Sequence, residues 1–398
     1  MISSRPILLG LALTSAWSLP APAAEAGSWM AALRYRHEQV DDEAFARDAS
    51  ADTARLRLGW TQALVPGLTA VVEGESVAEL SDRFNSTANG RSTYPIVADP
   101  RAIELNRLQL EWRDAHYGVT VGRQRVALDN QRFVGNVGWR QNEQTFDALA
   151  LEWRPQDSLV LRYHWLDRVH RVNGDEARDP LARERRLDAH LLNGAWTVSG
   201  GALVAYAYLV ADRDVTAAST RTLGLRWSGK LTGRPLQFGW SVEAARQQDY
   251  DANPAHFGHA YALAESSLHW GGVDWKLGFE RLGGNGHHAF QTPLATLHAF
   301  NGWADKFLVT PPQGLEDRYV GASGKLGRGA WTDRLSWAWV WHDFRAARGG
   351  DDYGDEWNAS LGTSFGRGWS GLVKFADYRS DGFARDTQKL WLQLEWTH

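Results

Sequence analysis

The chain has 398 residues, a formal net charge of −4 and no cysteine. It is too long for a small module held together by disulfides, and its slight acidic excess gives no reason to expect a nucleic-acid partner. Its 21 tryptophans favour a membrane protein over a soluble one, because indole rings prefer the boundary between lipid and water.

The N-terminal segment is typical of an export signal. Arg5 precedes a short apolar run over 7–13, and small residues follow at 21–24. This layout predicts a signal peptide over residues 1–24 and a single domain over 25–398. No later apolar run approaches the ~18 residues that a membrane helix requires. The mature chain is therefore either secreted and soluble, or it crosses a membrane as β-strands.

Apolar and polar residues alternate along much of the chain. In the first clear example, Leu56, Leu58 and Trp60 lie on one face, and Arg55 and Arg57 lie on the other. A period of two predicts β-strands with one apolar and one polar face. Tryptophan ends several of these segments on the apolar side, as in the aromatic girdles of membrane barrels. The same alternation returns over 107–113, 148–154, 223–227, 275–280, 334–341 and 389–396.

Short turns and longer polar connections also alternate along the chain. We predict short turns at 66–67, 114–115, 155–158, 199–200, 232–235, 271–272, 327–329 and 367–368. We predict longer connections near 41–52, 80–103, 129–144, 170–185, 211–220, 249–258, 283–316, 346–353 and 381–386. About eighteen strands fit between them. This pattern predicts an all-β fold, a transmembrane antiparallel β-barrel in the outer membrane of a Gram-negative bacterium, with short periplasmic turns and longer extracellular loops.

The polar faces of the predicted strands carry many charged side chains. There are too many of them to bury unpaired, so they must meet water. A barrel of this size encloses an aqueous channel, so we expect the leucines and tryptophans to face lipid and the charges to face the lumen. The predicted pore-wall residues are Arg55, Arg57, Arg107, Glu111, Arg113, Glu152, Arg154, Arg162 and Arg226.

The segment 122–148 is too polar for a core and too rich in bulky side chains for a plain linker. Strict alternation from Tyr117, Val119 and Val121 would place Arg123 on the lipid face. Either the strand has risen above the lipid there, or a β-bulge at Gly122 turns the arginines inward. We favour the bulge or an inward fold, because glycine adopts sharply bent backbone conformations with little strain. The predicted pore-constriction residues are Arg123, Arg125, Arg132, Arg140, Asp129, Glu143 and Asp147.

Four stretches of this segment resemble the signature block of the alginate export family of outer-membrane proteins. They are VGRQ at 121–124, NQRFVG at 130–135, GWRQ at 138–141 and TFDA at 145–148. The resemblance implies a monomeric eighteen-stranded barrel with an arginine-rich constriction that passes an anionic uronate polymer. The polar face of this chain mixes both signs of charge, so a uniformly electropositive funnel does not follow.

We therefore expect a passive channel rather than an enzyme. Its solutes would be anionic small molecules or uronate poly- and oligosaccharides such as alginate. Arginines would raise the local concentration of anions, while nearby carboxylates would keep binding weak enough for release. We expect contact with outer-membrane lipids, a periplasmic export partner where export is driven, and no cofactor or metal.

Two alternatives remain open at this stage. A barrel enzyme acting on lipid would need a Ser–His pair with a third group, and no nucleophile motif surrounds the candidate residues. A secreted carbohydrate-binding β protein would use the tryptophans for its ligand and would leave the cell envelope without detergent. The residues considered for catalysis are His164, His190, His269, His342, Ser267 and Ser336.

Overall fold

The computed structural model describes residues 27–233, 236–327 and 335–398. The predicted signal peptide over 1–24 lies outside these residues, as do parts of the predicted turns at 232–235 and 327–329. The described residues form eighteen strands in one sheet. The strands are β1 Ser28–Asp42, β2 Ala49–Val65, β3 Leu68–Glu79, β4 Ala102–Arg113, β5 Tyr117–Gln124, β6 Thr145–Gln156, β7 Leu159–His170, β8 Glu184–Val198, β9 Gly201–Asp212, β10 Thr220–Thr232, β11 Gln237–Asp249, β12 Gly258–Trp270, β13 Val273–Gly283, β14 Gly314–Lys325, β15 Leu335–Arg345, β16 Asp352–Gly366, β17 Trp369–Ser380 and β18 Thr387–Thr397.

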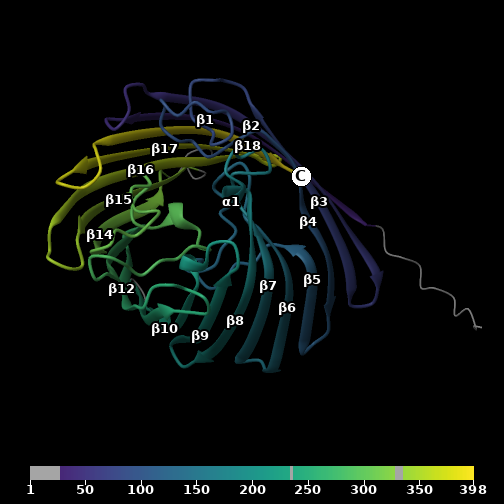
Figure 1. Cartoon of the computed structure of the whole chain (residues 1–398). Coiled ribbons are helices and arrows are strands. Elements are labelled where there is room, and N and C mark those ends of the chain that lie inside the picture. The colour runs from purple at the N-terminus through teal and green to yellow at the C-terminus, as the bar shows by residue number, and fades with distance from the viewer. Residues whose placement is uncertain (1–26, 234–235, 328–334) are drawn as a thin grey trace, which may run out of the picture.

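The sheet closes on itself. Each strand pairs antiparallel with its neighbours in the chain, and β1 also pairs with β18 from Ala32↔Thr397 to Asp42↔Thr387. Closure leaves no unpaired strand edge, which is what a sheet in lipid requires. Figure 1 shows the strands as a ring around segments that fold into its interior. The predicted antiparallel barrel of about eighteen strands is confirmed.

The connections follow the predicted alternation of short and long. At the first short turn Gly67 has a φ of 80°, and a Cβ there would lie 2.7 Å from the carbonyl oxygen of Arg113. Only glycine fits such a position without strain. The helical segments all lie in long connections: α1 Pro180–Arg183, η1 Thr216–Ala218 and η2 Leu297–Ala299. The long connections span 43–48, 80–101, 125–144, 171–183, 213–219, 250–257, 284–313, 346–351 and 381–386.

The two faces of the sheet have opposite chemistry. Leu108 is 55% exposed on the outer face and Leu277 is 62% exposed, whereas Arg55 and Glu73 are buried inside. A soluble secreted protein would have to cover such an apolar outer face, so the secreted alternative does not fit this fold. Several tryptophans stay exposed close to the short-turn ends of the strands, as the girdle prediction requires: Trp29, Trp112, Trp153, Trp196, Trp270 and Trp275.

Among the described residues, no helix has the length and apolar character needed to cross a membrane.

Candidate functional site in the barrel lumen

Two long loops enter the lumen and meet there. Loop 125–144 joins β5 to β6, and loop 284–313 joins β13 to β14, eight strands further around the ring. Val134 and Leu294 form a parallel β-bridge, and the Gly135 N–H donates to the Leu294 carbonyl at 2.9 Å. The side chain of Gln144 donates to the same carbonyl at 3.0 Å. The two loops are therefore joined to each other inside the lumen, and Figure 1 shows chain segments within the ring of strands.

Arg132 fixes loop 125–144 to the far wall of the barrel. Its Nε donates to Glu280 on β13 at 2.6 Å. Its two Nη atoms donate to Thr292 and Asn301 of loop 284–313, each at 3.0 Å. The guanidinium also lies 4.9 Å from the Phe300 ring, and the residue is 2% exposed. Arg132 lies in the lumen as predicted, but it acts as a buried anchor for both loops.

Arg140 makes the second anchor, towards β1 and β18. One Nη donates to Glu38 at 3.2 Å and the other to Asp305 of loop 284–313 at 3.1 Å. Lys389 donates to the same Asp305 carboxylate at 3.0 Å, and the His298 ring lies 2.7 Å from it. Asp305 therefore holds three basic side chains from three parts of the chain. Such charge-assisted hydrogen bonds are stronger than neutral ones.

An aromatic cage around Lys374 ties both loops to the wall. The Lys374 Nζ lies 3.8 Å from the Trp303 ring, 4.2 Å from Trp139 and 5.4 Å from Trp391. Trp139 and Trp303 come from the two loops, whereas Lys374 and Trp391 lie on β17 and β18. His298 stacks on Trp139 with a centroid separation of 4.7 Å. The cage therefore holds Trp139 of one loop and Trp303 of the other against the same side chain of the wall.

His298 is neutral in this arrangement. Lys374 lies 2.7 Å from its Nε2, so the ring accepts there and donates from Nδ1 to Asp305. Burial lowers the pKa of His298 to about 3, and Lys374 adds to this effect, although Asp305 opposes it. A released loop would restore the ordinary pKa of about 6.5.

We expect acid to release the loops. His298 binds fewer protons in the packed loop than in a released one, so its contribution favours packing above pH 6.5 and is lost as the pH falls towards 3. Asp305 does not titrate in this window, because Arg140, Lys389 and the His298 ring together hold its pKa well below the usual range despite its burial. Conductance noise in planar bilayers should rise between pH 6.5 and 4, and His298→Asn should flatten that rise. An unchanged pH profile in the variant would contradict this role.

Arg125 joins a charged network on the wall of β2 to β4. It forms ion pairs with Glu73 and Glu143, which are both buried. Arg57 pairs with Glu75 in the same network, and Arg107 lies 3.8 Å from Glu73. Four predicted residues, two from the constriction and two from the wall, thus come together inside the lumen.

The prediction for Arg123 and Asp147 is wrong. The register of β5 is continuous against both β4 and β6, so no bulge occurs at Gly122. Arg123 lies opposite the exposed Leu108 and opposite Asp147, and residues directly across a sheet share a face. The two side chains pair with each other on the outer face at 2.9 Å. They lie at the long-loop end of the barrel, where the strand has risen to the rim.

Asp129 points to a different wall from the predicted arginines. It accepts hydrogen bonds from Asn193 at 2.9 Å and from Tyr208 at 3.4 Å, on β8 and β9. Burial raises the pKa of this carboxyl, although the Asn193 hydrogen bond opposes the change. Asp129 is therefore a hydrogen-bonded contact between loop 125–144 and the wall, and within the described part of the chain it forms no ion pair with the constriction arginines.

The remaining predicted wall residues lie on the lumen face. Most of their guanidinium groups have a carboxylate partner, so the wall is a mixed rather than a uniformly positive surface. No ion pair involves Arg113 among the described residues. The pairs are Arg55–Glu395 at 2.8 Å, Arg107–Glu111 at 3.6 Å, Arg154–Glu152 at 2.6 Å, Arg162–Glu152 at 2.9 Å and Arg226–Glu243 at 3.1 Å.

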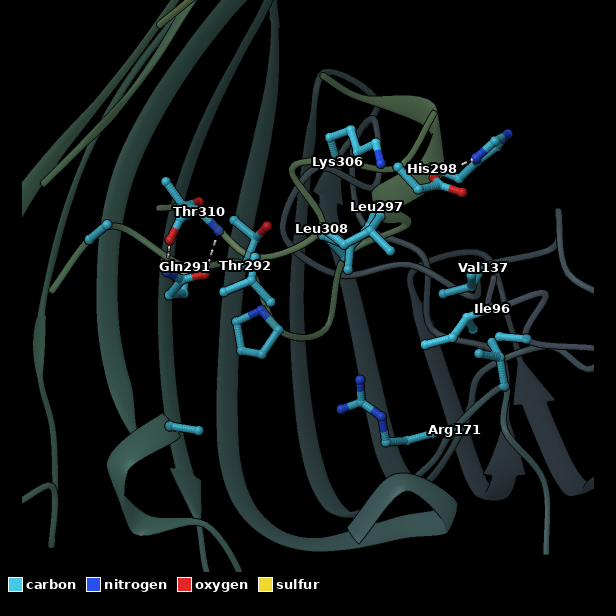
Figure 2. A pocket seen from close by; sticks show the side chains of 18 of the residues that line it. Ile96, Val137, Arg171, Gln291, Thr292, Leu297, His298, Lys306, Leu308 and Thr310 are labelled. Atoms are coloured by element: carbon cyan, nitrogen blue, oxygen red, sulfur yellow. Dashed lines mark hydrogen bonds and ion pairs between the residues drawn. The ribbon is translucent and has the colours of Figure 1, made fainter. Parts of the chain in front are cut away.

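A cavity of about 910 Å³ lies where the two loops meet the long-loop ends of the strands. Its lining includes aliphatic side chains such as Ile96, Val137, Leu297 and Leu308. Figure 2 shows the Arg171 side chain pointing into this space. The charged residues of the lining are Arg140, Arg171, Arg185, Lys306 and Lys389 on the basic side, and Asp42 and Asp305 on the acidic side. We call this cavity the vestibule.

Arg171 is the uncommitted cation of the vestibule. Among the described residues it has no carboxylate partner, whereas the neighbouring Arg185 pairs with Asp212 at 2.8 Å. Burial and the charge of Arg185 lower the pKa of Arg171 to about 10, so the group remains charged at neutral pH. The sequence prediction missed Arg171, Lys306 and Lys389. Lys389 lies within the alternation over 389–396 but was not selected, whereas Arg171 and Lys306 lie in loops, where no alternation marks the side chains that fold inward.

Comparisons with known proteins agree with this geometry. The sequence model of a family described as alginate export matches residues 30–280. No curated protein matches the chain. The solved structure of the outer membrane protein OpdK from Pseudomonas aeruginosa has a TM-score of 0.73 at 15% identity, covering 94% of this chain and 99% of its own. OpdO of the same species has a TM-score of 0.73 at 16% identity, covering 94% and 97%. Acinetobacter baumannii OccAB4 has a TM-score of 0.70 at 12% identity, covering 96% and 100%.

Proposed function

The chain belongs to the alginate export family of outer-membrane β-barrel proteins, and on this premise we propose that it is a monomeric, passive channel for small organic anions. The vestibule is the observation that carries the proposal. Five basic side chains and two acidic ones line a cavity with aliphatic walls. A carboxylate with an apolar body fits both parts of that lining, because the guanidinium groups bind the anion and the aliphatic groups contact the rest. One relative of the same fold, OpdK, has been solved with vanillate, which is such a carboxylate.

The deeper wall supports release rather than tight binding. Arginines and carboxylates alternate along the lumen, as in the network of Arg57, Arg107 and Arg125 with Glu73 and Glu143. An anion that leaves the vestibule meets guanidinium groups whose charge is already partly balanced. Conduction requires binding sites that are favourable but weak, and a mixed wall provides them.

The loops argue for small solutes rather than a uronate polymer. A polymer would have to thread a lumen that loops 125–144 and 284–313 cross together. Moving them aside would break the buried anchors at Arg132 and Arg140. We therefore place monomeric organic acids and short oligouronates in the substrate class, and long alginate chains outside it.

Arg171→Gln should lower anion selectivity. The substitution removes the uncommitted cation and leaves the loop anchors intact. We expect the anion-to-cation permeability ratio in planar bilayers at low salt to fall by about two- to fivefold. A cleft lined by positive charge raises the local concentration of anions, and the variant has less of that charge. Block of the chloride current by benzoate-type carboxylates should weaken in the same variant.

Arg168→Gln is the matched control, since Arg168 lies three residues earlier and pairs with Glu184 at the rim. It should leave selectivity unchanged. Equal selectivity in the wild type and in Arg171→Gln would remove the vestibule from the conduction path, and cation selectivity in the wild type would overturn the proposed function.

A further inference from the structure

The outer face of β9 to β12 carries two arginines with no partner. Arg246 on β11 lies opposite Leu223, which is 54% exposed on the lipid-facing side. Arg221 lies two residues before Leu223 on β10 and therefore shares its face. Both side chains are exposed. Among the described residues, neither guanidinium has a hydrogen bond or an ion pair.

This pair differs from eight other arginines near the same end of the barrel, each of which has a carboxylate partner. On the outward positions of β9 to β12 there is no acidic residue at all. The two arginines therefore form an exposed positive patch that nothing in the described chain neutralises. The paired rim arginines are Arg123 with Asp147, Arg168 with Glu184, Arg186 with Asp214, Arg213 with Asp188, Arg281 with Glu316, Arg318 with Asp343, Arg345 with Asp343 and Arg379 with Asp386.

The surface below the patch is apolar. Leu225 and Val242 are exposed on it, at 49% and 41%. Ala244 lies between them in the sheet, opposite both Leu225 and Ala262. Small side chains between larger aliphatic ones leave a shallow strip along which an acyl chain can lie. The strip runs from the arginines towards the membrane interior.

The position of the patch identifies the partner. The long-loop end of an outer-membrane barrel faces the cell exterior. Arg221 and Arg246 are diagonal neighbours on adjacent strands, a spacing of about 7–8 Å between backbones, so their forks can hold one phosphate between them. We propose that the outer face of β10 and β11 binds the phosphate of an acylated, phosphorylated glycolipid of the outer leaflet, with the acyl chains on the strip below. This site is independent of the conduction path.

Native mass spectrometry of the delipidated barrel in detergent tests the site. The probes are an acylated, bis-phosphorylated glucosamine disaccharide and the same glycolipid without its phosphates. The wild type should retain one phosphorylated molecule. The affinity of the double variant R221Q/R246Q for this lipid should be lower by at least about tenfold, because two charge-assisted contacts are lost.

The control is R318Q/R345Q, which removes two outward arginines that share Asp343. It should bind as the wild type does, and heat-modifiable gel mobility shows that each barrel is folded. Equal retention by R221Q/R246Q, or equal retention of the dephosphorylated lipid, overturns the proposal. Displacement of the lipid by millimolar inorganic phosphate also overturns it, because free phosphate would then be the ligand.

Discussion

Replacing Arg132 by alanine should open the lumen. The change leaves Glu280 buried on β13 without its cation and removes two hydrogen bonds that hold loop 284–313. Removing one partner of a buried ion pair costs about 3–5 kcal/mol, because the other charge stays buried without a partner. This cost is enough to shift the loops from the packed to the released state. Single-channel conductance should rise several-fold with increased noise, and trypsin should cleave within 125–144 more readily than in the wild type.

Arg123→Ala provides the control in the same segment. Arg123 was predicted to share the constriction, but it pairs with Asp147 on the outer face, so its loss should leave conductance unchanged. The double variant Arg132→Met with Glu280→Leu removes both charges together. It should recover much of the wild-type conductance, since replacing a buried pair by apolar groups is often neutral. Wild-type conductance in Arg132→Ala would show that Arg132 does not hold the loops.

Asp305→Asn should make the channel both noisier and more anion-selective. Asp305 is the shared acceptor of Arg140, Lys389 and His298. Its neutralisation leaves Lys389 without its carboxylate and Arg140 with Glu38 as its remaining hydrogen-bonded carboxylate, at a cost of up to about 3–5 kcal/mol. It also removes one of the two acids of the vestibule. The reversal potential in a salt gradient should shift towards the equilibrium potential of the anion. This shift is opposite in sign to the one expected for Arg171→Gln.

Asp42→Asn is the comparison variant. Asp42 also lines the vestibule and holds Lys306 of loop 284–313 at 2.7 Å, but this is a single contact, whereas Asp305 is bonded by Arg140, Lys389 and His298. Neutralisation of Asp42 should raise anion selectivity with less added noise than Asp305→Asn. Equal noise in the two variants would show that the three contacts of Asp305 hold the loops no more firmly than the single contact of Asp42.

Much of the fold could be predicted from local patterns. The alternation around Leu56, Leu108 and Leu277 specifies which face of each strand meets lipid, because side-chain direction in a strand depends only on parity. Glycine and proline turns such as Pro66-Gly67 mark the strand ends within a residue or two. The number of strands follows from counting the turns, and an even number of amphipathic strands of this kind predicts a closed barrel.

The candidate site was predicted only in part. Arg125, Arg132, Arg140 and Glu143 lie in the lumen as expected, whereas Arg123 and Asp147 do not. The error came from the bulge assumed at Gly122. Glycine permits a bulge but does not require one, and here the strand keeps its register to the rim. Parity was the better guide.

By itself, the sequence determined the strands, their faces, the turns and the family block, since each of these depends on residues close together in the chain. Only the tertiary structure decided which charges meet. Arg132 and Glu280 are 148 residues apart, and Arg140 and Glu38 are 102 residues apart. Their contact depends on barrel closure and on two loops that fold inward from opposite walls. No local pattern encodes such a pairing, so the anchors, the vestibule and the uncommitted Arg171 emerge only when the chain is folded.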